Sequence, residues 1–316
     1  MKKRYIFGPV PSRRLGRSLG IDLIPFKTCS YDCIYCQLGR TTNKTVERKE
    51  YFPREEIVKN LETQLREASL PDYITLAGSG EPTLYGPLEE LIRGIKEITD
   101  IPVALLTNGS LFWDEGMRRS VREVDLIVPS LDAGDEETFL SVNRPHEDVS
   151  FSRMTEGLCA LREGFQGDLW LEVFLAGGIT DEDPAIANIK RWMDRINPDR
   201  VQLNTAVRTP AEDYVHMVPQ ERMEAIADFM GPQAEVIADY TGVHDRGEFH
   251  LTRTDVFDLL KRRPCSLDDI STGLGLHRNE VIKYVQELLD HDSIRMEKRN
   301  DKTLYMVDHT VSSNEV

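Results

Sequence analysis

The stretch Thr28-Cys29-Ser30-Tyr31-Asp32-Cys33-Ile34-Tyr35-Cys36-Gln37 places three cysteines within eight residues. Iron–sulfur cubes are held by cysteine thiolates, and a complete cage takes four of them. A C-x3-C-x2-C triplet without a fourth cysteine leaves one iron open, so that a substrate or cofactor can bind there. The triplet therefore predicts a [4Fe–4S] cluster with one open iron.

Two other interpretations of the triplet stay open. A distant histidine could complete a Cys3His zinc site, which is a common structural cage. Zinc ligands usually come as two short pairs, however, and no second pair lies nearby in the sequence. The three cysteines could also be unrelated structural thiols, although their crowding argues against this. The remaining Cys159 and Cys265 are too few for a second cluster.

The spacing of Cys29, Cys33 and Cys36, with Tyr35 before the last of them, resembles the cluster loop of the radical S-adenosylmethionine (radical SAM) superfamily. In that superfamily, the amino and carboxylate groups of S-adenosylmethionine (SAM) bind the open iron. The resemblance implies that the three cysteines are metal ligands and that Tyr35 packs against the cofactor. It implies a [4Fe–4S] cluster and SAM as cofactors.

Beyond the cysteines, short apolar runs alternate with amphipathic segments, which is typical of βαβ units and a parallel sheet. The expected strands are residues 18–25, 73–77, 103–107, 124–130, 169–176 and 200–206, with 235–239 as a possible extra strand. The expected helices are residues 54–68, 87–97, 136–142, 152–163, 183–196 and 219–230. Six such units favour a partial (β/α)6 barrel, the fold that the resemblance also implies. Ligands of such sheets lie at the carboxyl ends of the strands.

A glycine-rich turn, Gly78-Ser79-Gly80-Glu81-Pro82, follows the second expected strand. It resembles the Gly-Gly-Glu-Pro turn with which the superfamily holds the ammonium group of SAM, with Ser79 in place of one glycine. The resemblance implies cofactor contacts by Ser79, Gly80 and Glu81. An ordinary glycine-rich turn is the alternative for this segment taken alone.

Polar residues also follow other expected strands. Asn108 ends the third strand, and Ser130 and Asp132 lie two residues apart at the end of the fourth. In the superfamily, polar groups at these places face the ribose and the methionine carboxylate, which implies further cofactor contacts. Asn204, at the end of the sixth strand, is a comparable candidate. Ser and Asx residues also favour turns in general.

The segment Phe7-Gly8-Pro9-Val10-Pro11-Ser12-Arg13-Arg14-Leu15-Gly16 precedes the expected sheet. Together with the cysteine loop, over about residues 4–240, it resembles a group of uncharacterised radical SAM proteins related to wybutosine-type tRNA synthases. Those tRNA enzymes depend on further cysteines for a second cluster near the N-terminus. This chain has no cysteine before Cys29, so we expect one cluster only. The sequence names no catalytic acid, base or radical relay.

The pattern changes after about residue 250. Helices are expected from Thr254, Ser266 and His277, followed by a hairpin of residues 294–299 and 303–307. Three helices and a hairpin favour a winged helix-turn-helix with the third helix in the recognition position. We therefore divide the chain into a radical SAM barrel with a basic N-terminal segment (1–250), a winged helix-turn-helix (251–309) and a frayed tail (310–316).

Charge is distributed unevenly along the chain. The net charge of −15 disfavours nonspecific attraction to nucleic acid or anionic membranes. Residues 1–49 nevertheless hold eleven Lys and Arg against three acidic residues, which predicts either a solvated tail or a positive rim for an anionic substrate. Residues 250–309 carry ten basic and eleven acidic residues, and so attract DNA phosphates little. We expect this part to be an accessory that the radical chemistry does not need.

These observations favour an enzyme that cleaves SAM reductively to a 5′-deoxyadenosyl radical, which abstracts hydrogen from an unknown small-molecule, peptide or RNA substrate. An external electron donor of the flavodoxin or ferredoxin type is expected. The alternatives are a radical SAM enzyme that modifies RNA with the winged helix as docking module, and an iron–sulfur redox sensor that binds DNA. Five cysteines, three of them clustered, fit a reducing compartment, and no apolar run reaches the ~20 residues of a membrane span. We expect a cytoplasmic protein without a membrane partner.

Overall fold

An eight-stranded sheet organises the larger part of the chain, in the order β1-β2-β5-β6-β7-β8-β9-β10. The computed structural model describes residues 5–12, 14–67, 70–207, 210–238, 240, 253–274, 276, 278–299 and 302–307. The strands are β1 (Ile6–Ser12), β2 (Gly16–Ile21), β5 (Tyr73–Leu76), β6 (Val103–Thr107), β7 (Leu126–Pro129), β8 (Asp168–Leu175), β9 (Arg200–Thr205) and β10 (Ala234–Val236). All neighbouring strands of this sheet run parallel, except that β1 pairs antiparallel with β2. The α/β fold with a mostly parallel sheet is confirmed.

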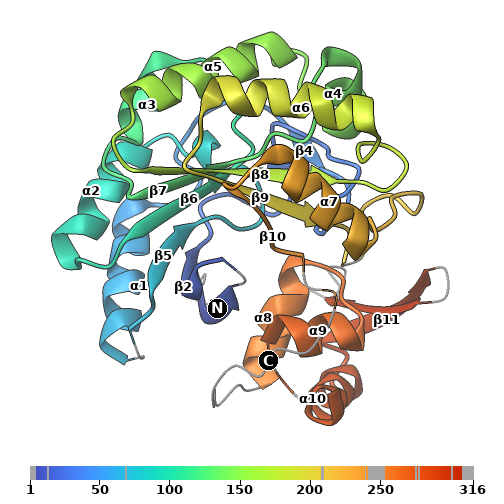
Figure 1. Cartoon of the computed structure of the whole chain (residues 1–316). Coiled ribbons are helices and arrows are strands. Elements are labelled where there is room, and N and C mark those ends of the chain that lie inside the picture. The colour runs from blue at the N-terminus through green and yellow to red at the C-terminus, as the bar shows by residue number, and fades with distance from the viewer. Residues whose placement is uncertain are drawn as a thin grey trace.

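One face of the sheet is covered by amphipathic helices (Figure 1). They are α1 (Arg54–Glu67), α2 (Leu88–Ile98), α3 (Glu115–Ser120), α4 (Glu136–Val142), α5 (Phe151–Gly164), α6 (Asp183–Ile196) and α7 (Gln220–Met230). In α2 the buried residues fall on one stripe, at Leu88, Leu91, Ile92 and Ile95. This spacing of three and four residues is what a helix needs to bury a single face against a sheet. None of the helices that the structure describes is both long and apolar enough to cross a membrane.

The strands are apolar on both faces because both faces are buried. In β8, Leu169, Leu171 and Val173 belong to the core between the sheet and its helices. Trp170 belongs to a separate cluster, with residues of β6 and β7. Successive side chains of a strand point to opposite faces, so Glu172 shares the face of Trp170. Parallel strands that are buried on both faces read as near-continuous apolar runs, which explains why the sequence revealed them.

The N-terminal part of the sheet differs from the prediction. We expected one strand at residues 18–25 with a proline-stiffened segment before it, but the structure forms two strands, β1 and β2. Strand β1 contains Pro9 and Pro11, and its register with β2 shifts between Phe7 and Val10. Proline lacks the N–H that a central strand must donate, so it is tolerated at an edge such as β1. The apolar alternation that would reveal a strand is interrupted by these prolines.

Two further differences concern β10 and α3. The strand proposed only as possible at residues 235–239 is present as β10, which pairs parallel with β9; Asp239 lies outside the described residues. Helix α3 was not predicted. Its six residues are too few to show a helical period, and it begins where the side chain of Asp114 accepts a hydrogen bond from the Met117 N–H.

The C-terminal unit has its own small core. It consists of α8 (Arg253–Arg262), α9 (Leu267–Leu274), α10 (Arg278–Asp290) and the antiparallel strands β11 (Ile294–Arg299) and β12 (Lys302–Val307). The three helices and the strand β11 meet at buried residues that include Val256, Ile270, Val281 and Ile294. In Figure 1 this unit lies below β10 and α7, at the end of the molecule away from α3, α5 and α6. The expected boundary near residue 250 and the expected tail 310–316 lie outside the described residues.

Helix α5 packs closely against the chain before α3. A Cβ atom at Gly157 would lie 2.4 Å from the backbone nitrogen of Trp113, whereas one at Gly164 of the same helix would meet nothing within 4 Å. Replacing Gly157 with Ala forces backbone atoms apart, so we expect the free energy of unfolding to fall by about 1–3 kcal/mol.

The matched variant Gly164→Ala should leave the free energy of unfolding unchanged or raise it by up to about 1 kcal/mol, because alanine restricts the unfolded chain. Urea unfolding followed by circular dichroism measures both variants. Equal effects of the two substitutions would contradict the close packing of α5 at Gly157.

Candidate functional site

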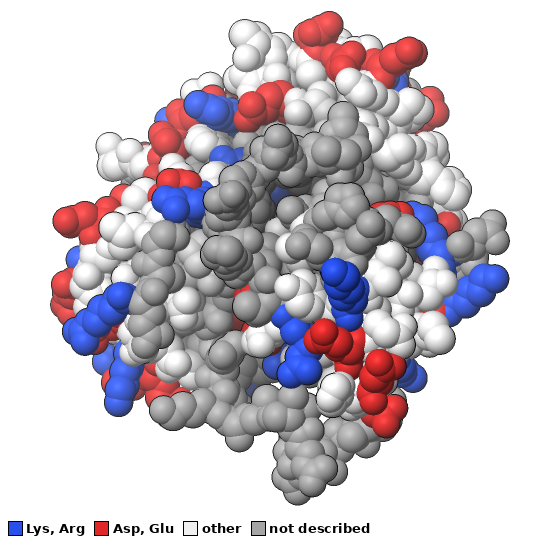
Figure 2. All heavy atoms as spheres, turned by 90° about the horizontal axis from the view of Figure 1, so that it is seen from below, with Lys and Arg blue, Asp and Glu red and all other residues white. Residues whose placement is uncertain are grey.

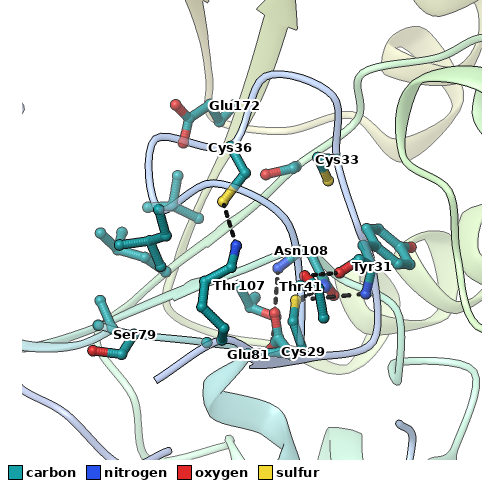
Figure 3. A pocket seen from close by; sticks show the side chains of 18 residues that line it. Cys29, Tyr31, Cys33, Cys36, Thr41, Ser79, Glu81, Thr107, Asn108 and Glu172 are labelled. Carbon is teal, nitrogen blue, oxygen red and sulfur yellow. Dashed lines mark hydrogen bonds between the residues drawn. The ribbon is translucent and has the colours of Figure 1, made fainter. Parts of the chain in front are cut away.

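A cavity of about 310 Å³ lies at the carboxyl ends of β5, β6 and β7 (Figure 3). Residues from three consecutive strand ends and from the cysteine loop line it together. Of the predicted site residues, those that line it are Cys29, Cys33, Cys36, Ser79, Gly80, Glu81, Asn108 and Ser130. Residues up to 101 positions apart in the chain thus meet in one place, as the parallel sheet requires of turns at the same edge.

The cysteine loop is held at both of its ends. Its start forms the short strand β3 (Thr28–Cys29), which pairs with β4 (Asn43–Lys44). The buried Ser30 exchanges a hydrogen bond of 2.7 Å with Ser110 and accepts another, of 2.9 Å, from the side chain of Asn108. Further along the loop, the N–H of Ile34 donates to the carbonyl of Val142. These bonds fix the loop against the turns that follow β6 and α4.

The cysteines are half-buried, and their thiol groups are spread around the cavity (Figure 3). Burial, together with the nearby charge of Glu81, raises the pKa of Cys29 to about 12, and burial raises the pKa of Cys33 well above its ordinary value. As free groups these thiols are therefore protonated and poor nucleophiles, whereas a metal would hold them as thiolates. Among the described residues, no group of three or more His, Cys, Asp and Glu is gathered closely enough to hold one metal ion.

Amide groups lie beside two of the sulfur atoms. The side chain of Asn108 donates to Sγ of Cys29 at 3.5 Å, and that of Asn143 donates to Sγ of Cys33 at 3.5 Å. Donors at a sulfur stabilise its negative form. The Asn108 amide thus connects the turn after β6 directly to the first cysteine.

Glu81 is buried, with 2 % of its surface exposed. Both of its carboxylate oxygens accept hydrogen bonds. Oε1 accepts from the N–H and hydroxyl of Thr83 and from the hydroxyl of Thr107, at 2.6–3.0 Å. Oε2 accepts from the N–H of Asn108 at 2.8 Å. Burial raises the pKa of Glu81, while these donors act in the opposite direction. Glu81 therefore holds two turns together in addition to any ligand that it binds.

Lys27 is a cavity residue that the sequence analysis missed. Its side chain is buried, and its ammonium group lies 3.7 Å from Sγ of Cys36 and donates to the carbonyl of Gly39. The backbone of Lys27 has φ of +63°, which is uncommon for a residue other than glycine. A buried cation at this place offsets the negative charge of thiolates. Its position directly before the cysteine loop was the available signal.

Tyr31 and Glu172 also line the cavity without having been predicted. The buried hydroxyl of Tyr31 has no hydrogen-bond partner in the described part of the chain, so a ligand in the cavity could satisfy it. Glu172 accepts two hydrogen bonds, of 2.8 and 3.0 Å, from Arg14. A single carboxylate within the apolar run of residues 169–175 was the sequence signal for Glu172.

Three predicted cofactor contacts, Tyr35, Asp132 and Asn204, are not among the residues that line the cavity. The Tyr35 hydroxyl donates to Asp132, and its ring stacks on Phe174 with centroids 4.0 Å apart. Asp132 is buried, and burial raises its pKa to about 6. Asn204 donates to Glu172 at 2.9 Å. Asn204 therefore contacts the cavity through Glu172, which lines it.

A family model of the radical SAM superfamily matches residues 23–188, which contain the cysteine loop, β5–β8 and the glycine-rich turn. The chain belongs to the radical SAM superfamily. Enzymes of this superfamily use a [4Fe–4S] cluster together with SAM, and the chain is an enzyme of this kind.

Several relatives resemble nearly the whole chain. A protein of Methanocaldococcus jannaschii named as a UPF0026 protein is 36% identical over 91% of this chain and 87% of its own length. A protein of Brachyspira hyodysenteriae named GTPase Obg is 39% identical over 97% of this chain, which spans only 46% of that relative. The crystal structure of SuiB from Streptococcus suis bound to S-adenosylmethionine aligns with a TM-score of 0.53 at 13% identity, over 70% of this chain and 52% of that one. This last likeness shows a shared fold.

The residues that line the cavity fit the two cofactors of the superfamily. Three thiols that surround a cavity without converging on a point suit a cube, because each iron of a cube takes its own thiolate. The buried Lys27 supplies a positive charge beside the sulfur atoms, and Glu81 supplies a negative charge near the backbone of Gly80. Gly80 itself leaves no room for a side chain, since a Cβ there would lie 1.9 Å from the carbonyl oxygen of Thr28.

Removing the Glu81 carboxylate should weaken the fold as well as the site. Glu81→Ala leaves the N–H groups of Thr83 and Asn108 without their acceptor, so we expect the free energy of unfolding to fall by about 2–3 kcal/mol. The exposed Glu62, which pairs with Arg66 one helical turn away in α1, is the control. Glu62→Ala should cost less than about 0.5 kcal/mol. Urea unfolding of the metal-free chain is the measurement, and equal losses would contradict the structural role of Glu81.

Proposed function

We propose that Cys29, Cys33 and Cys36 hold one [4Fe–4S] cluster and that the turn of residues 78–81 holds SAM beside it. The open sheet then corresponds to a partial (β/α)6 barrel. When bound, these cofactors supply the one-electron cleavage of SAM to methionine and a 5′-deoxyadenosyl radical, which abstracts hydrogen from a substrate. The observation that carries the proposal is the meeting of three half-buried cysteines and the Glu81 turn in one cavity.

The residues of the chain have separate roles in this proposal. The three thiolates bind iron, and the side chains of Asn108 and Asn143 stabilise two of them by hydrogen bonds. Backbone and carboxylate groups of Gly80 and Glu81 bind the ammonium group of SAM. Apolar walls that include Leu106 and Val128 keep water away from the reactive centre. An external donor of the flavodoxin or ferredoxin type supplies the electron.

For the C-terminal unit we propose a winged helix-turn-helix. Its three helices followed by an antiparallel hairpin support this assignment, with α10 in the recognition position. In the view of Figure 2, described Lys and Arg residues lie beside Asp and Glu residues. Such intermingled charges attract phosphate backbones weakly, so we favour the enzyme over a redox sensor that binds DNA.

RNA remains among the proposed substrates, beside small molecules and peptides, and anaerobic incubation with total RNA tests it.

Anaerobic reconstitution tests the cluster. We expect about four irons and four sulfides per chain and broad absorption near about 400 nm, as for cubes held by thiolates. Cys29→Ala, Cys33→Ala and Cys36→Ala should each remove most of this iron. Cys159 is a half-buried thiol in α5, and Cys159→Ala should retain the iron.

With a strong reductant, the wild type should release 5′-deoxyadenosine from SAM, and the three iron-deficient variants should not. Stoichiometric zinc without iron in protein purified without oxygen would overturn the proposal.

The charge of Lys27 should set the reduction potential of the cluster. A buried cation next to Cys36 favours the more negative, reduced form, so Lys27→Met should lower the midpoint potential by on the order of 100 mV, from the Coulomb energy of one charge at about 5–6 Å with an effective dielectric constant of about 20. Lys44 bonds to backbone carbonyls at 144 and 145 and provides the control, Lys44→Met, with an unchanged potential. Redox titration followed by electron paramagnetic resonance measures both. An unchanged potential in Lys27→Met at full iron content would exclude this role.

A further inference from the structure

Helix α8 of the C-terminal unit ends against the first strand of the sheet. The guanidinium carbon of Arg262 lies 3.1 Å from the ring centroid of Phe7 in β1. That ring occupies the space that a side chain on the neighbouring strand β2 would need, since a Cβ at Gly20 would lie 1.9 Å from it. Phe7 and Gly20 are also paired residues in the β1–β2 register. The last residue of α8 is therefore packed into the sheet.

The charge of Arg262 acts on Asp22, which directly follows β2. Burial lowers the pKa of Arg262 to about 10, and Asp22 is the acidic group that most counteracts this. In return, Arg262 lowers the pKa of Asp22, a carboxyl whose pKa burial raises. The two groups thus share a poorly solvated region, where opposite charges stabilise each other more than at the surface.

Asp22 in turn holds the turn that lines the cavity. Its carboxylate accepts from the N–H of Ser79 at 3.0 Å and from the hydroxyl of the same residue. The approach is close, because a Cβ at Gly78 would lie 2.5 Å from Oδ1 of Asp22. Ser79, Gly80 and Glu81 are the residues that this turn contributes to the cavity. Arg262 thus lies against Phe7, beside Gly20, and Asp22, two residues after Gly20, binds the cofactor turn, so the charge of Arg262 acts on the carboxylate that holds this turn.

A second, parallel contact comes from the next residue. Arg263 is buried, with 7 % of its surface exposed, and its Nη1 donates to Oε1 of Gln37 at 3.1 Å. Gln37 directly follows Cys36, the third cysteine of the loop. Two consecutive arginines of the C-terminal unit thus contact the larger part of the chain, Arg262 at Phe7 of β1 and Arg263 at Gln37 beside the cysteine loop.

We propose that the C-terminal unit completes the cofactor site, with Arg262 positioning the SAM-binding turn through Asp22 and Ser79, and Arg263 positioning the cysteine loop through Gln37. The inference rests on the proposed function, because it takes residues 78–81 as the SAM-binding turn. Both arginines are positioning residues that act through others. The inference replaces our expectation that the C-terminal unit is an accessory without a part in the cofactor chemistry.

The test uses the full chain with its reconstituted cluster and SAM as the probe. Arg262→Met keeps an apolar contact with Phe7. We expect the dissociation constant of this variant for SAM to be about tenfold larger than that of the wild type, at unchanged iron content. Arg262→Lys keeps the charge and should bind SAM within about threefold of the wild type. Lys261 lies one residue earlier in α8 and pairs with Asp258, so Lys261→Ala is the matched control with unchanged affinity. Calorimetry gives the affinities, and thermal unfolding shows whether a variant is folded.

A double-mutant cycle separates positioning from mere docking of the two parts. If Arg262 acts through Asp22, Asp22→Asn combined with Arg262→Met should weaken SAM binding about as much as the stronger single variant, because both break the same chain of contacts. Additive losses, or a folded Arg262→Met that binds SAM as the wild type does, would overturn the inference. Failure of the wild type to bind SAM would overturn the proposed function instead.

Arg263 has its own measurement. Arg263→Met should speed the loss of iron to a chelator several-fold, because the loop at Cys36 loses its support, while its affinity for SAM stays near that of the wild type. Gln37→Leu should reproduce this result, since it removes the other partner of the same hydrogen bond. An unchanged rate of iron loss in both variants would exclude the role of Arg263.

Discussion

The buried carboxylate of Glu81 is the constraint on which the site depends. It accepts hydrogen bonds from the segment after β5 and from the end of β6, and the N–H of Glu81 donates to the carbonyl of Thr28 at the start of the cysteine loop. Asn108, whose N–H binds this carboxylate, reaches Cys29 with its side chain. Because a carboxylate without these donors is costly to bury, the three segments are held in one arrangement.

Local patterns in the sequence predicted those parts of the site that are local in the chain. The cysteine triplet and the glycine-rich turn each lie within ten residues, and the alternation of apolar runs places both at the same edge of a sheet. Lys27 and Glu172 were not predicted, because a charged residue becomes informative only when its burial is known. Their neighbours in space, Cys36 and Arg14, lie 9 and 158 residues away.

Tyr35 and Asp132 show what a motif does not reveal. Each was predicted as a cofactor contact from its place in a motif, and each is polar or aromatic beside a strand end. In the structure they bind one another, and the Phe174 N–H also donates to Asp132 at 3.0 Å. Sequence position identifies the end of the sheet but not which side chains face the cavity there.

The net charge of the C-terminal unit does not describe its individual charges. Basic and acidic residues nearly balance over residues 250–309, a balance that predicts weak attraction to DNA. Electrostatic effects depend on where each charge lies and on how well water solvates it. Arg262 and Arg263 lie against the larger part of the chain, near Asp22 and Gln37, while acidic residues such as Asp268 are exposed. In our proposal, one buried and one half-buried arginine at this contact therefore act on a site that the average charge of the unit does not reveal.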